Sequence, residues 1–138
     1  MDPAALPRPE ITPLDRPYWA YLRAHDYRLQ RCADCGAFRF PAAPLCPDCG
    51  ARTHDWTPCS GRGAVISWVV FHRCYFPAFA GDIPYNVAMI RLEEGPVVIA
   101  NLRGIANAAI RAGLPVEVVF EDVDESLTIA NFRPREGA

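Results

Sequence analysis

Residues 32–50 read CADCGAFRFPAAPLCPDCG and contain two Cys-x2-Cys pairs, Cys32 with Cys35 and Cys46 with Cys49, separated by ten residues. A glycine follows each pair, as in tight knuckles whose backbone N–H groups can point at sulfur. Four thiolates from two such knuckles complete a tetrahedral zinc site with Zn–S distances of about 2.3 Å. No coordination position stays open, so the spacing predicts a structural zinc and not a catalytic one.

Two other chemistries compete for these cysteines. Iron in a rubredoxin-type site would use the same four thiolates. A thioredoxin-like redox pair needs a single Cys-x-x-Cys in a βαβ setting, whereas two pairs occur here in tandem outside such a setting. The spacing therefore favours zinc, with iron as its chemical rival.

The sequence around the cysteines predicts a mainly β chain in three parts. Residues 1–26 form a proline-rich arm and a short helix that Asp15 caps, with Pro17 in the first turn. Residues 27–58 form the zinc ribbon, and residues 59–138 form the last domain.

The last domain shows the alternation of a small β-barrel. Its expected elements are three strands, a short helix and two strands, at residues 64–73, 85–93, 97–103, 105–112, 116–121 and 127–133. This order is typical of a five-stranded OB-fold barrel. We therefore predict an N-terminal helix, a rubredoxin-like zinc ribbon and then an OB fold.

Composition excludes several classes of protein. The chain has 138 residues and a formal net charge of −2, unlike a protein that binds phosphate backbones. All 14 basic side chains are arginine, so Schiff-base and P-loop lysines are absent. Six cysteines without an export signal or a membrane-length apolar run predict a reducing, cytoplasmic location and no membrane partner.

A catalytic centre is not predicted. His72 and Cys74 lie two residues apart in a strand or strand end, where they could share a face as base and nucleophile. No third group to orient them is apparent in the sequence. We interpret Cys59 and Cys74 as small buried apolar residues.

Aromatic residues mark possible contact surfaces. Tyr18 and Trp19 could pack on their own domain or anchor a partner subunit, and the sequence leaves these two readings open. The segment 71–79 combines aromatic residues with an arginine and a proline, which suits a ligand groove or an interface more than a solvated loop. The predicted interface residues are Tyr18, Trp19, Phe38, Phe40, Tyr75, Phe76 and Phe79.

Four runs together resemble one known family. They are PYWAYLRAHDYRLQRCADCGAFRFPAAPLCPDCG, SGRGAVISWVVFHR, PYNVAMIRLEEGP and VEVVFEDV, at residues 17–50, 60–73, 84–96 and 116–123. The chain is similar over roughly residues 12–134 to the small proteins, formerly of unknown function, that carry a rubredoxin-like zinc ribbon and an OB fold. All four ribbon cysteines of that family are present.

The resemblance implies an accessory role. Members of this family accompany thiolase-fold enzymes, including thiolases and the retro-aldolases of steroid side-chain degradation, and some associate with hot-dog-fold enoyl-CoA hydratases. They bind the partner and help to hold acyl-CoA, while the chemistry takes place on the partner. The expectation is a hetero-oligomer with structural zinc and acyl-CoA as a possible ligand.

Residue type alone suggests where acyl-CoA could bind. A CoA ligand needs cations for its phosphates and an apolar slot for pantetheine, which residues 76–79 could supply. The candidate cations are Arg31, Arg39, Arg62 and Arg73. The first alternative to the accessory role is a single-stranded nucleic-acid-binding protein. The second, which the sequence favours less, is a stand-alone thiol enzyme.

Overall fold

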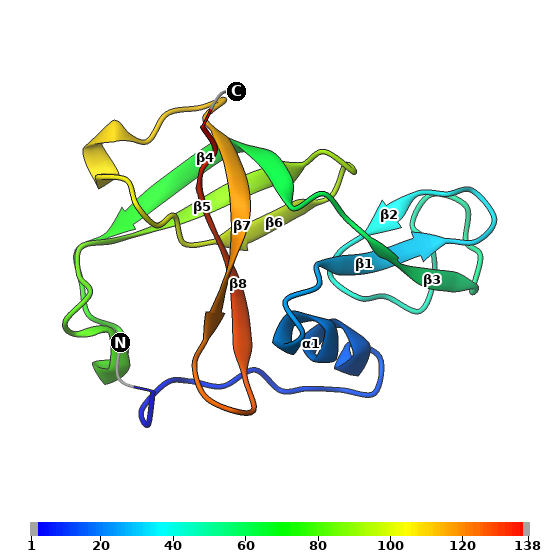
Figure 1. Cartoon of the computed structure of the whole chain (residues 1–138), viewed down its shortest axis with the longest axis horizontal. Coiled ribbons are helices and arrows are strands. Elements are labelled where there is room, and N and C mark those ends of the chain that lie inside the picture. The colour runs from blue at the N-terminus through cyan, green and yellow to red at the C-terminus, as the bar shows by residue number, and fades with distance from the viewer. Residues whose placement is uncertain (1–2, 137–138) are drawn as a thin grey trace.

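The computed structural model describes residues 3–136, which form one α-helix, two antiparallel sheets and two 3-10 turns (Figure 1). Helix α1, Arg16–Arg23, precedes both sheets. In the described residues, no helix has the length and apolar character needed to cross a membrane.

The smaller sheet is the ribbon. Its strands are β1 (Arg28–Cys32), β2 (Phe38–Arg39) and β3 (His54–Pro58), in the order β2-β1-β3. The central strand places Gln30 opposite Arg39 on one side and opposite Trp56 on the other. The two cysteine knuckles extend from this sheet, on the far side of the ribbon from the larger sheet (Figure 1).

The larger sheet has five strands in the order β6-β5-β4-β7-β8. They are β4 (Arg62–Phe71), β5 (Tyr85–Leu92), β6 (Val97–Ala100), β7 (Pro115–Asp122) and β8 (Thr128–Pro134). The chain after β6 meets β8 through a parallel bridge between Leu102 and Phe132, where Arg103 N–H donates to the Phe132 carbonyl at 2.8 Å. The sheet therefore curls into an OB-type half-barrel, and the predicted fold class is confirmed.

The helix predicted for residues 105–112 is wrong. The structure has only a 3-10 turn, η2 (Asn107–Ala109), between residues with extended backbone. The Asn107 side chain donates to the Pro84 carbonyl at 3.1 Å and accepts from Asn86 at 3.1 Å. These tertiary bonds fix the segment as a connection, and so short a stretch cannot offset the cost of nucleating a helix by itself.

Asp15 was predicted to cap α1, and its position is right but its hydrogen bonding is not. Asp15 occupies the N-cap position but makes no capping hydrogen bond. Its Oδ1 instead accepts from the Thr12 backbone N–H at 2.7 Å and from the Thr12 hydroxyl at 3.0 Å. The Asp15 carboxylate thus closes a turn that precedes the helix, because its Oδ1 accepts hydrogen bonds from Thr12 and not from the first turn of α1.

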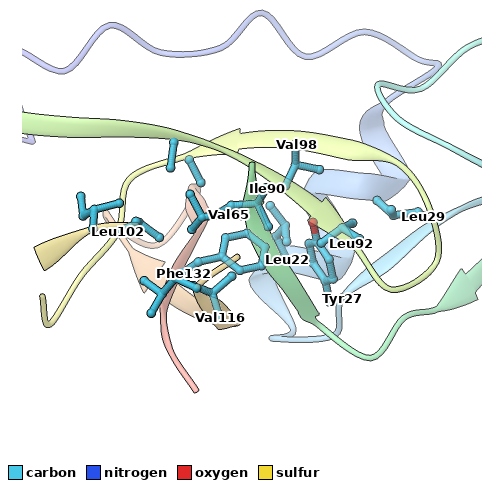
Figure 2. Packing of buried hydrophobic residues seen from close by; sticks show 14 residues of the cluster. Leu22, Tyr27, Leu29, Val65, Ile90, Leu92, Val98, Leu102, Val116 and Phe132 are labelled. Atoms are coloured by element: carbon cyan, nitrogen blue, oxygen red, sulfur yellow. The ribbon is translucent and has the colours of Figure 1, made fainter. Parts of the chain in front are cut away.

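One core joins α1 to the half-barrel (Figure 2). Leu22 of α1 is 1% exposed, and the Tyr27 ring meets the Phe132 ring edge-on at 6.3 Å. Burial of each such side chain stabilises the fold by about 1.5–3 kcal/mol. The short helix is therefore held by tertiary packing and not by its own propensity.

The ends of this helical segment are tied to the turn between β7 and β8. His25, in the left-handed region at φ 54°, follows the helix, and its Nε2 lies 2.9 Å from Asp122 Oδ1. The ring also stacks on Phe120 at 4.9 Å. Arg8 of the N-terminal arm forms an ion pair with Asp124. Arm, helix and half-barrel are thus linked by polar contacts as well as by the core.

Candidate metal centre

The two knuckles have matching backbone geometry. In the first, Gly36 N–H donates to the Cys32 carbonyl at 3.0 Å, and Cys32 N–H donates to the Ala37 carbonyl at 2.8 Å. In the second, the equivalent bonds run from Gly50 to Cys46 and from Cys46 to Ala51, both at 2.9 Å. Gly36 and Gly50 have φ of 79° and 80°, a region in which side chains with a Cβ are strained.

The four sulfurs converge on one point. Their Sγ atoms all lie within 4.8 Å of one another, with 3.5 Å between Cys32 and Cys49 and 3.6 Å between Cys35 and Cys46. A tetrahedron with Zn–S bonds of about 2.3 Å has S–S edges of about 3.8 Å. The residues present therefore fit a four-coordinate zinc, which would crosslink the two knuckles and leave no position for substrate.

The site also favours thiolate over thiol at one ligand. The backbone N–H of Cys35 donates to Cys32 Sγ at 3.5 Å. This hydrogen bond, together with those from the Asp34 backbone and from the Cys49 and Cys35 side chains, lowers the pKa of Cys32 to about 6. A thiolate is the form that binds metal, so the lowered pKa favours the ligand state at Cys32, whereas the pKa of Cys35 in the same knuckle is raised.

Gln30 fixes the loop between the knuckles and was missed by the sequence analysis. Its side chain is fully buried, and Oε1 accepts from Ala43 N–H at 2.8 Å and from Arg39 Nε at 3.1 Å. Its Nε2 lies 3.2 Å from His54 Nε2. A single glutamine in a short strand carries no sequence signal for this role, because the role depends on both neighbouring strands.

The predicted interface aromatics divide into two groups. The first group is half-buried and packs against the core, and it consists of Tyr18, Trp19, Phe38 and Phe40. In the second group, Tyr75 and Phe76 are 58% and 49% exposed, and half-buried Phe79 meets Phe76 edge-on at 6.2 Å. The second group forms the accessible aromatic surface, which we call the 75–79 loop.

The four arginines proposed for CoA do not share one environment. Arg31 and Arg73 are exposed and lie over the rings of Phe38 and Tyr75, at 5.1 and 5.2 Å. Arg62 begins the ten-residue strand β4 and Arg73 follows its end, so the full length of this strand, up to about 30 Å at about 3.3 Å per residue, lies between them. Arg39 is only 4% exposed. A single phosphate group could not contact both Arg62 and Arg73.

The two remaining thiols have backbone partners, and the interpretation of Cys74 as a buried residue is wrong, because its side chain is exposed. Exposed Cys74 donates to the Phe76 carbonyl at 3.1 Å, not to the imidazole of His72. Cys59 Sγ lies 3.6 Å from the Thr57 carbonyl, and its burial, followed by the charge of Glu94, raises the pKa of Cys59 to about 12. In the described residues, neither thiol is paired with an imidazole base.

Four converging thiolates on a small ribbon, followed by an OB-type half-barrel, define a protein of the zinc-ribbon plus OB-fold class. The family models described as "ChsH2, rubredoxin-like zinc ribbon domain" and "ChsH2, C-terminal OB-fold domain" match residues 19–55 and 56–121. The chain belongs to this ChsH2, or DUF35, family. The resemblance noted in the sequence is confirmed.

Curated relatives are of two kinds. A "DUF35 domain-containing scaffold protein" of Pyrococcus furiosus is 38% identical over 110 residues, 78% of this chain and 79% of that protein. A "probable enoyl-CoA hydratase alpha subunit" of Thermomonospora curvata is 42% identical over 135 residues, 96% of this chain but 41% of that protein. The "3-oxo-4,17-pregnadiene-20-carboxyl-CoA hydratase alpha subunit" of Mycobacterium tuberculosis is 34% identical, over 88% of this chain and 38% of that protein. The chain thus spans about two fifths of these hydratase subunits.

Solved structures agree with the family. A chain of the complex described as "Ltp2-ChsH2(DUF35) aldolase" superposes with a TM-score of 0.84 at 37% identity, covering 92% of this chain and 98% of that one. A DUF35 protein from Sulfolobus solfataricus superposes with a TM-score of 0.63 at 14% identity, which supports the fold alone.

Proposed function

We propose that this chain is a non-catalytic subunit of a complex in which a thiolase-fold enzyme, either a thiolase or a retro-aldolase, acts on a CoA thioester. The observation that carries the proposal is the likeness to a chain of a solved aldolase complex, 98% of which is covered here. Two relatives named as hydratase alpha subunits extend the proposal to a hydratase as a further partner. The role of the chain is to bind the partner and to help position acyl-CoA.

The chemistry of the side chains supports a non-catalytic role. Carbon–carbon bond formation or cleavage next to a carbonyl needs an activated nucleophile or base and an oxyanion hole in a water-poor pocket. The thiol of Cys74 is exposed and hydrogen-bonded to a backbone carbonyl, and Cys59 is held as a neutral thiol by its raised pKa. Four-thiolate zinc offers no open position for a substrate oxygen.

The accessible groups suit recognition. The 75–79 loop combines large exposed rings with the guanidinium of Arg73 stacked on Tyr75. Aromatic and arginine side chains are enriched at the anchoring centres of interfaces. We assign this loop to partner contact, with pantetheine as the alternative occupant, and exposed Arg73 beside the loop to CoA phosphates. Arg62 lies at the opposite end of β4 and cannot serve the same CoA molecule.

Reconstitution tests the proposal. The isolated, zinc-loaded chain is expected to show no thiolase, aldolase or hydratase turnover, to co-purify with a thiolase-fold enzyme encoded beside it, and to raise the turnover of that enzyme. The variants His72→Ala and Cys74→Ala should retain most of the turnover of the complex. If Cys74→Ala abolishes turnover while assembly persists, the chemistry lies on this chain and the proposal is wrong.

A further inference from the structure

A small cavity of about 140 Å³ lies between α1 and the ribbon. Aromatic rings make up much of its wall, and two charged side chains also line it. The rings are those of Tyr18, Trp19, Phe40 and Trp56, and the charged residues are Asp15 and Arg39. The cavity therefore combines low polarity with a buried cation.

The cation in this wall lacks part of its hydrogen bonding. Arg39 is 4% exposed, and its Nε donates to Gln30 Oε1 and to the Ala43 carbonyl, both at 3.1 Å. Its Nη1 and Nη2 are buried and have no acceptor in the described part of the chain. The indole Nε1 of Trp19, another residue of the same wall, is also buried without an acceptor. Three donor nitrogens on two cavity-lining residues thus lack an acceptor.

Asp15 makes no hydrogen bond to this guanidinium. It lines the cavity, but its Oδ1 already accepts two hydrogen bonds from Thr12, at 2.7 and 3.0 Å. It supplies no acceptor to Arg39 Nη1 or Nη2. Buried arginines are normally paired, because removing an isolated charge from water is costly. Water in the cavity could satisfy the N–H groups but would bring no negative charge to the guanidinium.

We propose that this cavity binds a carboxylate group. The Nη1 and Nη2 edge of a guanidinium matches the two oxygens of a carboxylate, and Nε is already occupied in Arg39. Trp19 lines the same cavity, and its N–H is the other donor there that lacks an acceptor. Aromatic walls suit a carboxylate on a short apolar group, and the negative charge of Asp15 disfavours a doubly charged phosphate. The carboxylate comes either from a free small acid or from an acidic side chain of a partner protein.

Acetate is the probe for the free-acid source. The full zinc-loaded chain, labelled with ¹⁵N, is titrated with sodium acetate against sodium chloride at constant ionic strength, and the Trp19 indole N–H resonance is followed. Trp19→Phe identifies this resonance among those of the three tryptophans. The expected result is a saturable shift that chloride and phosphate do not reproduce and that Arg39→Met, with its zinc content intact, abolishes.

Asp15→Asn keeps the test informative if Arg39→Met does not fold. Removal of the like charge at the cavity should tighten acetate binding by about threefold or more. If neither the wild type nor Asp15→Asn shows a saturable acetate shift, or if chloride or phosphate gives the same shift, the carboxylate site does not exist.

A second experiment distinguishes the two sources, and it rests on the proposed function. Acetate is added to the complex with the thiolase-fold enzyme. Weakening of the wild-type complex, but not of the Arg39→Met complex, identifies an acidic side chain of the partner as the occupant, whereas indifference to acetate identifies a free acid. If no complex forms, the proposed function fails while the acetate titration of the isolated chain still decides the carboxylate site.

Discussion

The side-chain amide of Asn86 hydrogen-bonds to both backbone groups of Leu102. Leu102 N–H donates to Asn86 Oδ1 at 2.6 Å, and Asn86 Nδ2 donates to the Leu102 carbonyl at 3.0 Å. Asn86 lies on β5, and Leu102 lies where the chain after β6 bridges to Phe132. One buried amide thus fixes the segment that closes the half-barrel.

We predict that Asn86→Ala destabilises the fold by about 2–6 kcal/mol, since two buried backbone groups would each lose a partner at about 1–3 kcal/mol. The measurement is the free energy of unfolding from urea titration. Asn107→Ala is the matched control, because it removes the bonds of Asn107 to Asn86 and to the Pro84 carbonyl but leaves both bonds to Leu102 in place. Equal stability of wild type and Asn86→Ala would show that closure does not depend on this amide.

The metal prediction concerns content and folding. Purified protein should hold one zinc per chain, because four thiolates complete its coordination. Cys35→Ser and Cys46→Ser should lose zinc and unfold the ribbon, since the remaining thiolates cannot close the site. Elemental analysis and circular dichroism measure both effects, with exposed Cys74→Ser as the control that keeps its zinc. Well-folded protein without metal would overturn this prediction, and iron would identify the rival site.

Cys59 should react slowly with iodoacetamide at neutral pH. Its pKa is raised to about 12, so the neutral thiol predominates below that pH. Because the thiolate is the nucleophile, its alkylation rate should rise about tenfold per pH unit without a plateau up to about pH 11. Peptide mapping by mass spectrometry measures this rate, with exposed Cys74 as internal reference. A plateau near pH 8 would mean that Cys59 is an activated thiol.

The partner surface is tested by Phe76→Ala combined with Phe79→Asp. We expect the affinity for the thiolase-fold enzyme to fall by about tenfold or more, as for loss of an anchoring aromatic pair. Zinc content should not change, and the unfolding midpoint should fall only modestly, because Phe76 is 49% exposed and Phe79 is half-buried. Calorimetry measures affinity, and Ile11→Ala, which alters an apolar side chain 42% exposed outside the loop, is the control. Unchanged affinity would exclude the 75–79 loop from the interface.

Single-stranded DNA should bind more weakly than the dissociation constants of about 10⁻⁴ to 10⁻⁶ M that are typical of non-specific binders. The net charge of −2 and the acidic residues at 121–125 oppose phosphate binding. Fluorescence anisotropy of a labelled oligonucleotide at several salt concentrations measures this binding. Tight binding that weakens steeply with salt would instead favour the nucleic-acid alternative.

The metal centre could be predicted from the sequence because its information is local. Two cysteines three residues apart and a following glycine define each knuckle, and ten intervening residues let the knuckles meet. The strands of the half-barrel could be predicted for the same reason, since alternation of side chains along a strand needs no knowledge of its neighbours.

Only the tertiary structure decided the features that depend on residues distant in the sequence. Asn107 was predicted in a helix and lies in a 3-10 turn, because Pro84 and Asn86 supply its partners. Arg39 and Arg31 look alike in the sequence, yet one is buried beside Gln30 and the other is exposed. Burial and hydrogen bonding are set by side chains that are distant in the sequence and close in space. The sequence by itself therefore determined the zinc ligands and the strands, and only packing decided which polar residues lie inside.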